Sequence, residues 1–582
     1  MTSSGRQGRL YLPVEGGPGE LGRFNALVQA GASVEALEEY RFLDTPEAVR
    51  SAISAGEVEL VVFDQQELGE QELSLAAGAP LRVGIDTGGG GEEFLDVTIH
   101  ALPRLPGESC PNLSSPGYLN LPARRREQWP EHILRVLVTL GGEDASGLAP
   151  RLAGELAELF GELRFFYTEG GRIHAVGADT ASGQPPLREE LAGFDLVILH
   201  YGMTLFEALY ARVPVLALPV SDYHRALAEA LDLDCTRGID IEDIAPELGR
   251  IVVDPRESVE RCRRVAPQKR RDLSSELDSL VPPGYRNPLF PGEARLDPVV
   301  FRLPDRSYYR CSSSGLLYMR RFRSPSIRYE ERYFFEEYRR QYGRTYLEDF
   351  EGIRRTGVGR LRLIRKLERD KKREKKERGA GRRLLDVGCA YGPFLKAAEE
   401  AGYLPFGIDV AEEAVAYVTD TLGYPASRTT LEELDPLTTF GHRRFEVITM
   451  WYVIEHIPDL PSLLSRVAEL LLPGGIFAFS TPNGEGVSAT TNREDFLRRS
   501  PEDHLTIWEP SRLSAVLEPF GFEVERVRVT GHHPERFPLI RESSSPMLRA
   551  LAAPLLRAKS KLRGLGDTFE CYCRRRRDGA DG

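Results

Sequence analysis

The stretch that decides the fold of this chain is 384-LLDVGCAYGPFLKAAEEAGYLPFGIDV-410. It reads as a buried strand, a glycine-containing turn, a helix, and a second strand that ends in an acid. Gly388 and Gly392 let the backbone approach a ligand closely at the end of the first strand, and the helix that follows offers free N–H groups there. Asp409 closes the second strand, where a carboxylate can accept both ribose hydroxyls of an adenosyl ligand. The turn Gly-Cys-Ala-Tyr-Gly departs from the dinucleotide fingerprint GxGxxG, so a dinucleotide-binding domain is the less favoured alternative.

Length and composition set the frame around this stretch. A chain of 582 residues is too long for one hydrophobic core, which predicts several domains. The net charge of -12 gives no overall reason to expect a nucleic-acid partner. The opening residues lack the apolar core of a signal peptide and no apolar run is long enough to span a bilayer, so a cytoplasmic protein is expected. Seven cysteines without a repeated CxxC favour reduced thiols.

The N-terminal half alternates short apolar runs with amphipathic stretches, which predicts an α/β architecture with parallel sheets. A polar, proline-containing stretch divides this half in two, and a second proline-rich stretch separates it from the rest. The expected domains are 1–120, 121–276, a linker with a small cap segment at 277–345, and a C-terminal domain at 346–582.

Four motifs occur in order in the C-terminal domain: DVGCAYG (386–392), GID (407–409), FEVITMWYVIEHIPDL (445–460) and LLPGGIFAFSTPN (471–483). Together they resemble the successive motifs of class I S-adenosylmethionine-dependent methyltransferases, most closely the small-molecule O-methyltransferases of ubiquinone biosynthesis. The resemblance implies a seven-stranded, mostly parallel sheet with an antiparallel last strand, for which GLGDTFECYCRR (564–575) is the candidate. It also implies S-adenosylmethionine as the cofactor.

The resemblance assigns roles by position to eight cofactor-binding residues. The first strand and its turn are expected to bind the methionine part of the cofactor, and the acid that ends the second strand is expected to bind the ribose. The segment SRTTLEEL (427–434) should flank the adenine, and the end of the fourth strand should lie beneath the cofactor. In that order the residues are Asp386, Gly388, Cys389 and Gly392; Asp409; Leu431; and Met450 with Trp451. Relatives often carry an Asp where this chain has Tyr452, so the acceptor side is expected to differ.

Methyl transfer is an in-line displacement in which alignment supplies much of the catalysis, and an oxygen acceptor also benefits from a base. His456 in EHIPD and His504 in EDHLTIW are the catalytic candidates. Each also fits a helix-capping or core histidine. Both interpretations stay open on the sequence alone.

The N-terminal half carries its own motif, HYGMTLFEALYARVPVLALPVSD (200–222). A strand ends at Gly202, and Thr204 opens a helix with Glu207 one turn in, which suits a diphosphate and a ribose. The segment resembles two-Rossmann (GT-B) glycosyltransferases, in particular the nucleotide-sugar hydrolases of pseudaminic-acid synthesis. Relatives place a catalytic His in the first glycine loop, where this chain has Glu20. Active glycosyl chemistry, nucleotide-sugar binding alone and a scaffold role are therefore all open.

Two segments between these halves are ambiguous. Aromatic residues recur every four positions from Phe334 to Tyr346, which indicates a helix that packs on the next domain or forms a lid. The basic stretch 361–383 reads as a solvated helix, with nucleic-acid contact as the weaker alternative. RSYYRCSSSGLLYM (306–319) resembles the small cysteine-rich module that precedes many such methyltransferases, in which a CxxC pair comes before GLLY. Only Cys311 remains here, and one thiolate cannot make a structural zinc site, so no metal is expected.

A third ambiguous segment, SPMLRALAAPLLRAKSKLRGLG (545–566), places four leucines along one helical face with basic residues nearby. Packing on the sheet, closure over the acceptor, and contact with an anionic membrane or a lipid-linked substrate are the three interpretations.

The sequence therefore predicts a methyltransferase that modifies a sugar or glycan hydroxyl, fused to a module with a nucleotide sugar as an additional ligand. A sugar is expected as the methyl acceptor only because the methyltransferase is fused to a module that resembles glycosyltransferases. The alternatives are a methyltransferase for a quinone, a lipid or another small molecule beside an inactive scaffold, and a glycan-binding or assembly protein without enzymatic activity.

Overall fold

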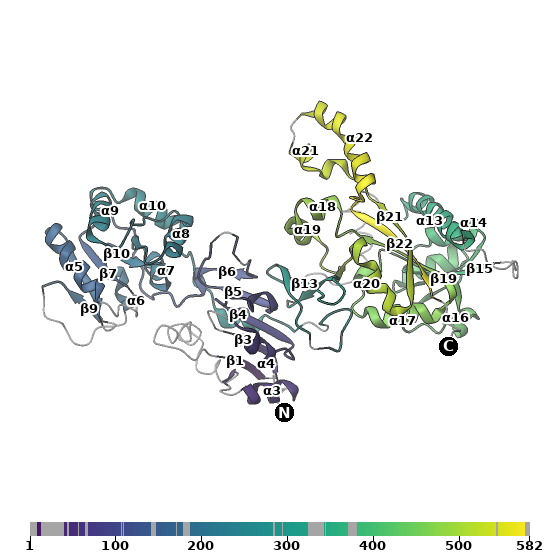
Figure 1. The fold of residues 1–582 in the computed structure, drawn as a ribbon, viewed down its shortest axis with the longest axis horizontal. Helices are drawn as coiled ribbons and strands as arrows, with labels where there is room; N and C mark the ends of the chain where they lie inside the picture. The colour runs from purple at the N-terminus through teal and green to yellow at the C-terminus, as the bar shows by residue number, and fades with distance from the viewer. Residues whose placement is uncertain are drawn as a thin grey trace. The chain divides into compact units, whose positions relative to one another are not determined.

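A computed structural model describes residues 8–12, 40–42, 46–55, 58–63, 68–105, 107–108, 110–140, 147–169, 172–177, 187–282, 286–293, 295–323, 343, 345–370, 381–542 and 545–576. The chain divides into two compact units (Figure 1). The first contains residues 1–282 together with the short segment Arg302–Arg306, and the second contains Pro283–Phe301 and Ser307–Gly582.

The first unit contains a six-stranded parallel sheet in the order β2-β1-β3-β4-β5-β6. Its central strand β3 (Val58–Phe63) is buried almost throughout, because helices and loops cover both faces of a parallel sheet. The other strands are β1 (Gly8–Leu12), β2 (Tyr40–Phe42), β4 (Leu81–Ile85), β5 (Val97–His100) and β6 (Leu113–Ser114), with the helices α3 (Pro46–Ser54) and α4 (Glu70–Leu75).

The same unit contains a five-stranded sheet in the order β11-β10-β7-β8-β9, in which only β8 and β9 pair antiparallel. Its strands are β7 (Arg135–Thr139), β8 (Arg164–Glu169), β9 (Arg172–Ala175), β10 (Leu196–His200) and β11 (Val215–Leu218). Its helices are α5 (Leu148–Leu159), α6 (Leu187–Glu190), α7 (Met203–Tyr210), α8 (Asp222–Ala230), α9 (Ile241–Val253), α10 (Arg256–Val265) and α11 (Leu273–Asp278). The predicted α/β architecture with parallel sheets is confirmed.

A four-stranded sheet follows, in the order β12-β13-β14-β20. Its strands are β12 (Val299–Arg302), β13 (Arg306–Arg310), β14 (Leu317–Arg321) and β20 (Thr506–Ile507), and the rings of Tyr309 and Tyr318 stack within it, with centroids 5.1 Å apart. Of the predicted aromatic stripe, Phe334, Tyr338 and Tyr342 lie outside the described residues. Tyr346 contacts Tyr391, with ring centroids 6.0 Å apart.

The second unit is built on a seven-stranded sheet in the order β17-β16-β15-β18-β19-β22-β21. The strands are β15 (Arg382–Val387), β16 (Tyr403–Asp409), β17 (Ala426–Arg428), β18 (Phe445–Trp451), β19 (Leu471–Pro482), β21 (Phe522–Thr530) and β22 (Thr568–Arg575). Because β22 runs antiparallel to both β19 and β21, the carboxyl ends of the other strands share one edge of the sheet.

The described part of the second unit also contains several α-helices. They are α13 (Phe350–Asp370), α14 (Pro393–Glu400), α15 (Glu412–Ala416), α16 (Pro436–Phe440), α17 (Leu460–Leu470), α18 (Val487–Thr491), α19 (Arg493–Arg499), α20 (Leu513–Leu517), α21 (Pro538–Arg541) and α22 (Pro546–Arg563). Among the described residues, no helix is long and apolar enough to cross a membrane. Cys571 and Cys573 point to the same face of β22 as free thiols, with their sulfurs 3.3 Å apart.

Candidate active site

The turn between β15 and α14 adopts a backbone that only a few residue types accept. Gly388, Ala390 and Gly392 all have positive φ angles, of 72°, 45° and 76°. A Cβ atom on Gly388 would lie 2.5 Å from a methyl group of Val453, so a side chain is excluded there by contact as well as by φ. Backbone N–H groups of Gly388 and Cys389 both donate to the carbonyl of Ile408, at 2.8 and 3.1 Å. The turn is therefore fixed against the end of β16.

Asp409 ties this turn to the second strand. One carboxylate oxygen accepts from the Ala390 N–H at 2.8 Å and the other from the Ala411 N–H at 2.9 Å. Burial raises the pKa of Asp409, although these backbone hydrogen bonds act in the opposite direction. Each oxygen keeps further acceptor capacity, since a carboxylate offers about four lone-pair sites.

Asp386 lies in the middle of the sheet and is almost fully buried. One of its oxygens accepts from the Thr449 hydroxyl on β18 at 2.6 Å. Burial raises the pKa of Asp386 to about 8, and the Thr449 hydrogen bond and the nearby Arg360 only partly oppose this. The carboxyl group is therefore poised to ionise when a cation approaches it.

Arg360 is a site residue that sequence reasoning did not find. It projects from α13 with its guanidinium 4.0 Å from the ring centroid of Trp451, and it donates to Glu570 on β22 at 2.9 Å. Nothing in the local pattern of α13 distinguishes this arginine from its solvated neighbours, because its partners come from β18 and β22.

Met450 and Trp451, both predicted to bind the cofactor, lie at the end of β18, and Tyr452 follows them. Met450 is fully buried, and Trp451 packs edge-on against Phe394 of α14, with ring centroids 5.1 Å apart. The indole N–H of Trp451 is shielded from solvent and finds no hydrogen-bond partner among the described residues. Tyr452 has a φ angle of 60° and leaves 43% of its surface exposed, so it turns outward at the strand end.

Two further predicted residues are buried by packing. Cys389 packs with Leu395 and Val418, and burial raises the pKa of its thiol well above the usual value. The side chain therefore faces the protein interior, and the turn presents the backbone of Cys389. Leu431 follows β17 and belongs to the same apolar core as Met450.

The two candidate histidines, far apart in sequence, meet at the carboxyl end of β18. His456 lies in the 3-10 turn η6 (Ile454–His456), and its ring packs edge-on against that of His504 with centroids 4.9 Å apart. The contact is held by a backbone hydrogen bond of 2.8 Å from Leu505 to the carbonyl of Glu455. Nδ1 of His456 lies 3.0 Å from the carbonyl oxygen of Asp503 and 3.3 Å from its carboxylate.

The surroundings of the two histidines shift their pKa values in opposite directions. Burial lowers the pKa of His456, but Asp503 and Glu455 outweigh it and raise the pKa above 6.5. Burial, together with the neighbouring His456, lowers the pKa of His504 to about 4. At neutral pH His504 is therefore uncharged, and a proton taken up by the pair belongs on His456.

Glu455 is the third member of this cluster. It is fully buried, burial raises its pKa to about 7, and neither carboxylate oxygen accepts a hydrogen bond from the part of the chain that the structure describes. Ligand atoms of Glu455, His456 and His504 lie within 4.8 Å of one another, a set that can bind a metal ion. The sequence alone gives no signal for this set, because only the fold brings His504 beside η6.

In the first unit, the predicted nucleotide-sugar residues lie where β10 meets α7. Gly202 precedes α7 in extended backbone, Thr204 lies in its first turn, and burial raises the pKa of Glu207 to about 7. His224 of α8 lies nearby, with its Nδ1 2.6 Å from the hydroxyl of Ser221. Glu20 lies outside the described residues.

Comparison with known proteins finds methyltransferases that match residues of the second unit. A methyltransferase domain family matches residues 359–527. A ubiquinone biosynthesis O-methyltransferase of Thiobacillus denitrificans is 29% identical over 164 residues, 27% of this chain and 70% of the relative. The namesake enzyme of Bordetella avium is 31% identical over 164 residues, 26% of this chain and 67% of the relative. A solved S-adenosylmethionine-dependent methyltransferase of Archaeoglobus fulgidus aligns with 41% of this chain and 99% of its own, at 15% identity and a TM-score of 0.29.

The chain belongs to the S-adenosylmethionine-dependent methyltransferases. It is an enzyme of that class, and its cofactor is S-adenosylmethionine. The family resemblance expected from the four motifs is confirmed for the C-terminal part of the chain.

Proposed function

We propose that the second unit methylates a hydroxyl group of a small-molecule acceptor, and that the histidine pair at the end of β18 receives the proton. The observation that carries this proposal is the contact of an uncharged His504 with His456, whose pKa Asp503 and Glu455 raise. A hydroxyl must lose its proton as it is methylated, and a base near its operating pH serves this step. The relatives are named as O-methyltransferases, which supports an oxygen acceptor.

The cofactor supplies a methyl group activated on a sulfonium. The residues at the edge of the sheet fit such a molecule, since they combine a glycine turn without bulky side chains, two buried carboxyl groups and an apolar floor. In the proposed arrangement Asp386 and the turn Gly388–Gly392 with Cys389 hold the methionine end, and Asp409 accepts the ribose hydroxyls. Leu431 borders the adenine, and Met450 with Trp451 forms the floor.

The proton pathway follows from the charges. His504 stays neutral and orients the acceptor hydroxyl, while His456 takes the proton and Asp503 and Glu455 stabilise the resulting positive charge. Protonation of His456 before the reaction removes this base. Activity should therefore rise with pH through the pKa of His456, which lies above 6.5.

The test uses the full chain, labelled S-adenosylmethionine and a catechol as the acceptor. We expect His456→Gln to lower turnover by about 100-fold, in line with general-base catalysis, and to abolish the pH dependence. His442→Gln, on the partly exposed loop before β18, is the matched control and should behave as wild type. Wild-type turnover with an unchanged pH profile in His456→Gln would contradict the role of this base.

A second candidate acceptor is a sugar or glycan hydroxyl. It is favoured by the first unit, where the buried Glu207 and the start of α7 suit a nucleotide sugar. We propose that this unit is a GT-B-like module that binds a nucleotide sugar. Heat on titration with uridine diphosphate, lost in Glu207→Ala but kept in the variant Glu242→Ala at an exposed position of α9, is the expected result. No heat with the wild type would favour a scaffold role and the catechol-type acceptor.

A non-enzymatic binding or assembly role is tested by the same measurements. If S-adenosylhomocysteine gives no heat with the wild-type chain, the proposed enzymatic site is dormant.

A further inference from the structure

Helix α22 presents four of its five leucines to solvent instead of to the protein. An α-helix turns about 100° per residue, so Leu548, Leu551, Leu555 and Leu562 lie within an arc of about 60°. These side chains are 41%, 62%, 73% and 87% exposed, and the adjacent Met547 is 74% exposed. We call these five residues the leucine stripe. Its exposure is inconsistent with packing against the sheet, one of the three interpretations of the sequence.

A different face of α22 anchors the helix to its own unit. Ala552 and Ser560 are buried, and the hydroxyl of Ser560 lies 2.7 Å from Nδ1 of His532. The helix packs against the short turn η9 (Pro534–Arg536), and Ser545 caps its first turn by accepting from the N–H of Leu548 at 3.3 Å. The helix is therefore held in place with its apolar stripe facing outward.

The charges of α22 point to the chemistry of its partner. The helix carries five basic residues and no acidic residue, although the whole chain has a net charge of -12. The basic residues are Arg549, Arg557, Lys559, Lys561 and Arg563. In the helical projection Lys559 lies about 20° beyond one edge of the leucines, and Lys561 lies on the opposite side of the stripe. A second copy of the chain would bring five like charges against five, which disfavours self-association through this face.

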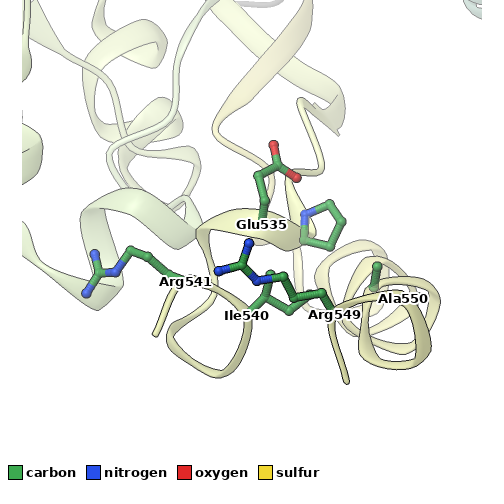
Figure 2. A pocket seen from close by; sticks show the side chains of 7 residues that line it. Glu535, Ile540, Arg541, Arg549 and Ala550 are labelled. Atoms are coloured by element: carbon green, nitrogen blue, oxygen red, sulfur yellow. The ribbon is translucent and has the colours of Figure 1, made fainter. Parts of the chain in front are cut away.

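A pocket of about 550 Å³ lies between η9, α21 and α22. Figure 2 shows Arg549 of α22 extending toward Glu535, above Ile540 of α21. Leu539 of α21 is 54% exposed and adds a further apolar side chain to this region. The surface thus combines exposed aliphatic groups with arginines and lysines over two consecutive helices.

We propose that α21 (Pro538–Arg541) and α22 (Pro546–Arg563) form a docking element for the surface of an anionic lipid bilayer. The leucine stripe enters the boundary between headgroups and acyl chains, and the flanking lysines and arginines contact lipid phosphates. An amphipathic helix with aliphatic residues on one side and basic residues beside them binds in this way, and affinity grows with buried apolar area and with anionic lipid content. The proposal does not depend on the identity of the methyl acceptor.

The test measures co-sedimentation of the full chain with vesicles. Wild type should bind phosphatidylcholine vesicles that contain about one third phosphatidylglycerol, and should bind pure phosphatidylcholine at least about tenfold more weakly. We expect Leu551→Gln/Leu555→Gln and Lys559→Glu/Lys561→Glu each to lower partitioning by about tenfold or more. Val253→Gln at the end of α9 removes another exposed apolar residue, 87% exposed, and should change nothing.

Two measurements separate the outcomes. Titration with S-adenosylhomocysteine should give wild-type affinity in both double variants, which shows that the second unit remains folded. Equal vesicle binding by wild type and Leu551→Gln/Leu555→Gln, or no binding to anionic vesicles, overturns the proposal. A wild-type dimer in sedimentation velocity that this variant converts to a monomer, without vesicle binding, identifies a second copy as the partner and also overturns it.

Discussion

Asp386→Asn tests the buried carboxyl group that we propose for the cofactor site. In the folded protein the pKa of Asp386 is about 8, far above its usual 3.8, because burial disfavours the charge. The unfolded chain loses this proton near pH 4 and the folded chain keeps it to about pH 8. The carboxyl group therefore destabilises the fold progressively as pH rises between these values. Asparagine has no such titration, so the variant should gain stability over wild type with rising pH.

The magnitude follows from the size of the shift. One pKa unit corresponds to about 1.4 kcal/mol, and relaxation around a buried group reduces the full effect. We expect the stability of Asp386→Asn relative to wild type to increase by about 2 to 4 kcal/mol between pH 5 and pH 8. This difference is about 5 to 10 °C in the melting temperature of the second unit. The amide NH2 that the substitution introduces affects stability equally at both pH values, so the change with pH is the diagnostic quantity.

Thermal unfolding at the two pH values measures this change, and Asp420→Asn is the control because Asp420 is exposed. An equal gap between Asp386→Asn and wild type at pH 5 and pH 8 would refute the reasoning. Titration with S-adenosylhomocysteine forms a second arm. If Asp386 holds the cofactor's amino group as proposed, loss of its carboxylate should weaken binding by about tenfold or more. Unchanged affinity would show that Asp386 does not contact the cationic end.

Three further predictions concern the same unit. Asp409→Ala should reduce binding of S-adenosylhomocysteine to below detection in calorimetry, because it removes the proposed ribose acceptor and releases the N–H of Ala390; wild-type affinity would exclude this role. Gly388→Ala should destabilise the unit by about 2 to 4 kcal/mol in urea unfolding, from strained φ and the clash with Val453. Gly402→Ala has a similar φ of 82° but open space around it, so it should cost only about 1 kcal/mol, and equal costs would contradict the contribution of contact. Glu570→Gln should cost about 3 kcal/mol or more in the same assay, because it leaves the buried Arg360 without its carboxylate; a loss under about 0.5 kcal/mol would show that the pair is dispensable.

The local sequence was sufficient to predict where the main residues of the proposed cofactor site lie. Asp386, Gly388, Gly392 and Asp409 lie on one strand–turn–helix–strand unit, whose internal geometry depends mainly on neighbours in sequence. Their placement at one sheet edge could therefore be predicted. Their roles toward the cofactor stay predictions, and so does the GT-B layout of the first unit.

Residues whose partners come from distant elements could not be predicted in the same way. Arg360 becomes a buried side chain only because Trp451 and Glu570 are brought beneath α13 by the sheet order. Likewise His504 and Glu455 form one cluster only because the loop before β20 hydrogen-bonds to η6.

The sequence by itself was enough to predict a methyltransferase in this chain, since the four motifs that carry the family resemblance are short stretches that can be recognised without the fold. It also placed four leucines of α22 on one helical face, because that depends only on the helical repeat. Only the tertiary structure decided that this face is exposed. The outward direction is set by which side of the helix finds partners, here Ala552 and Ser560 against η9, and no local pattern encodes that choice.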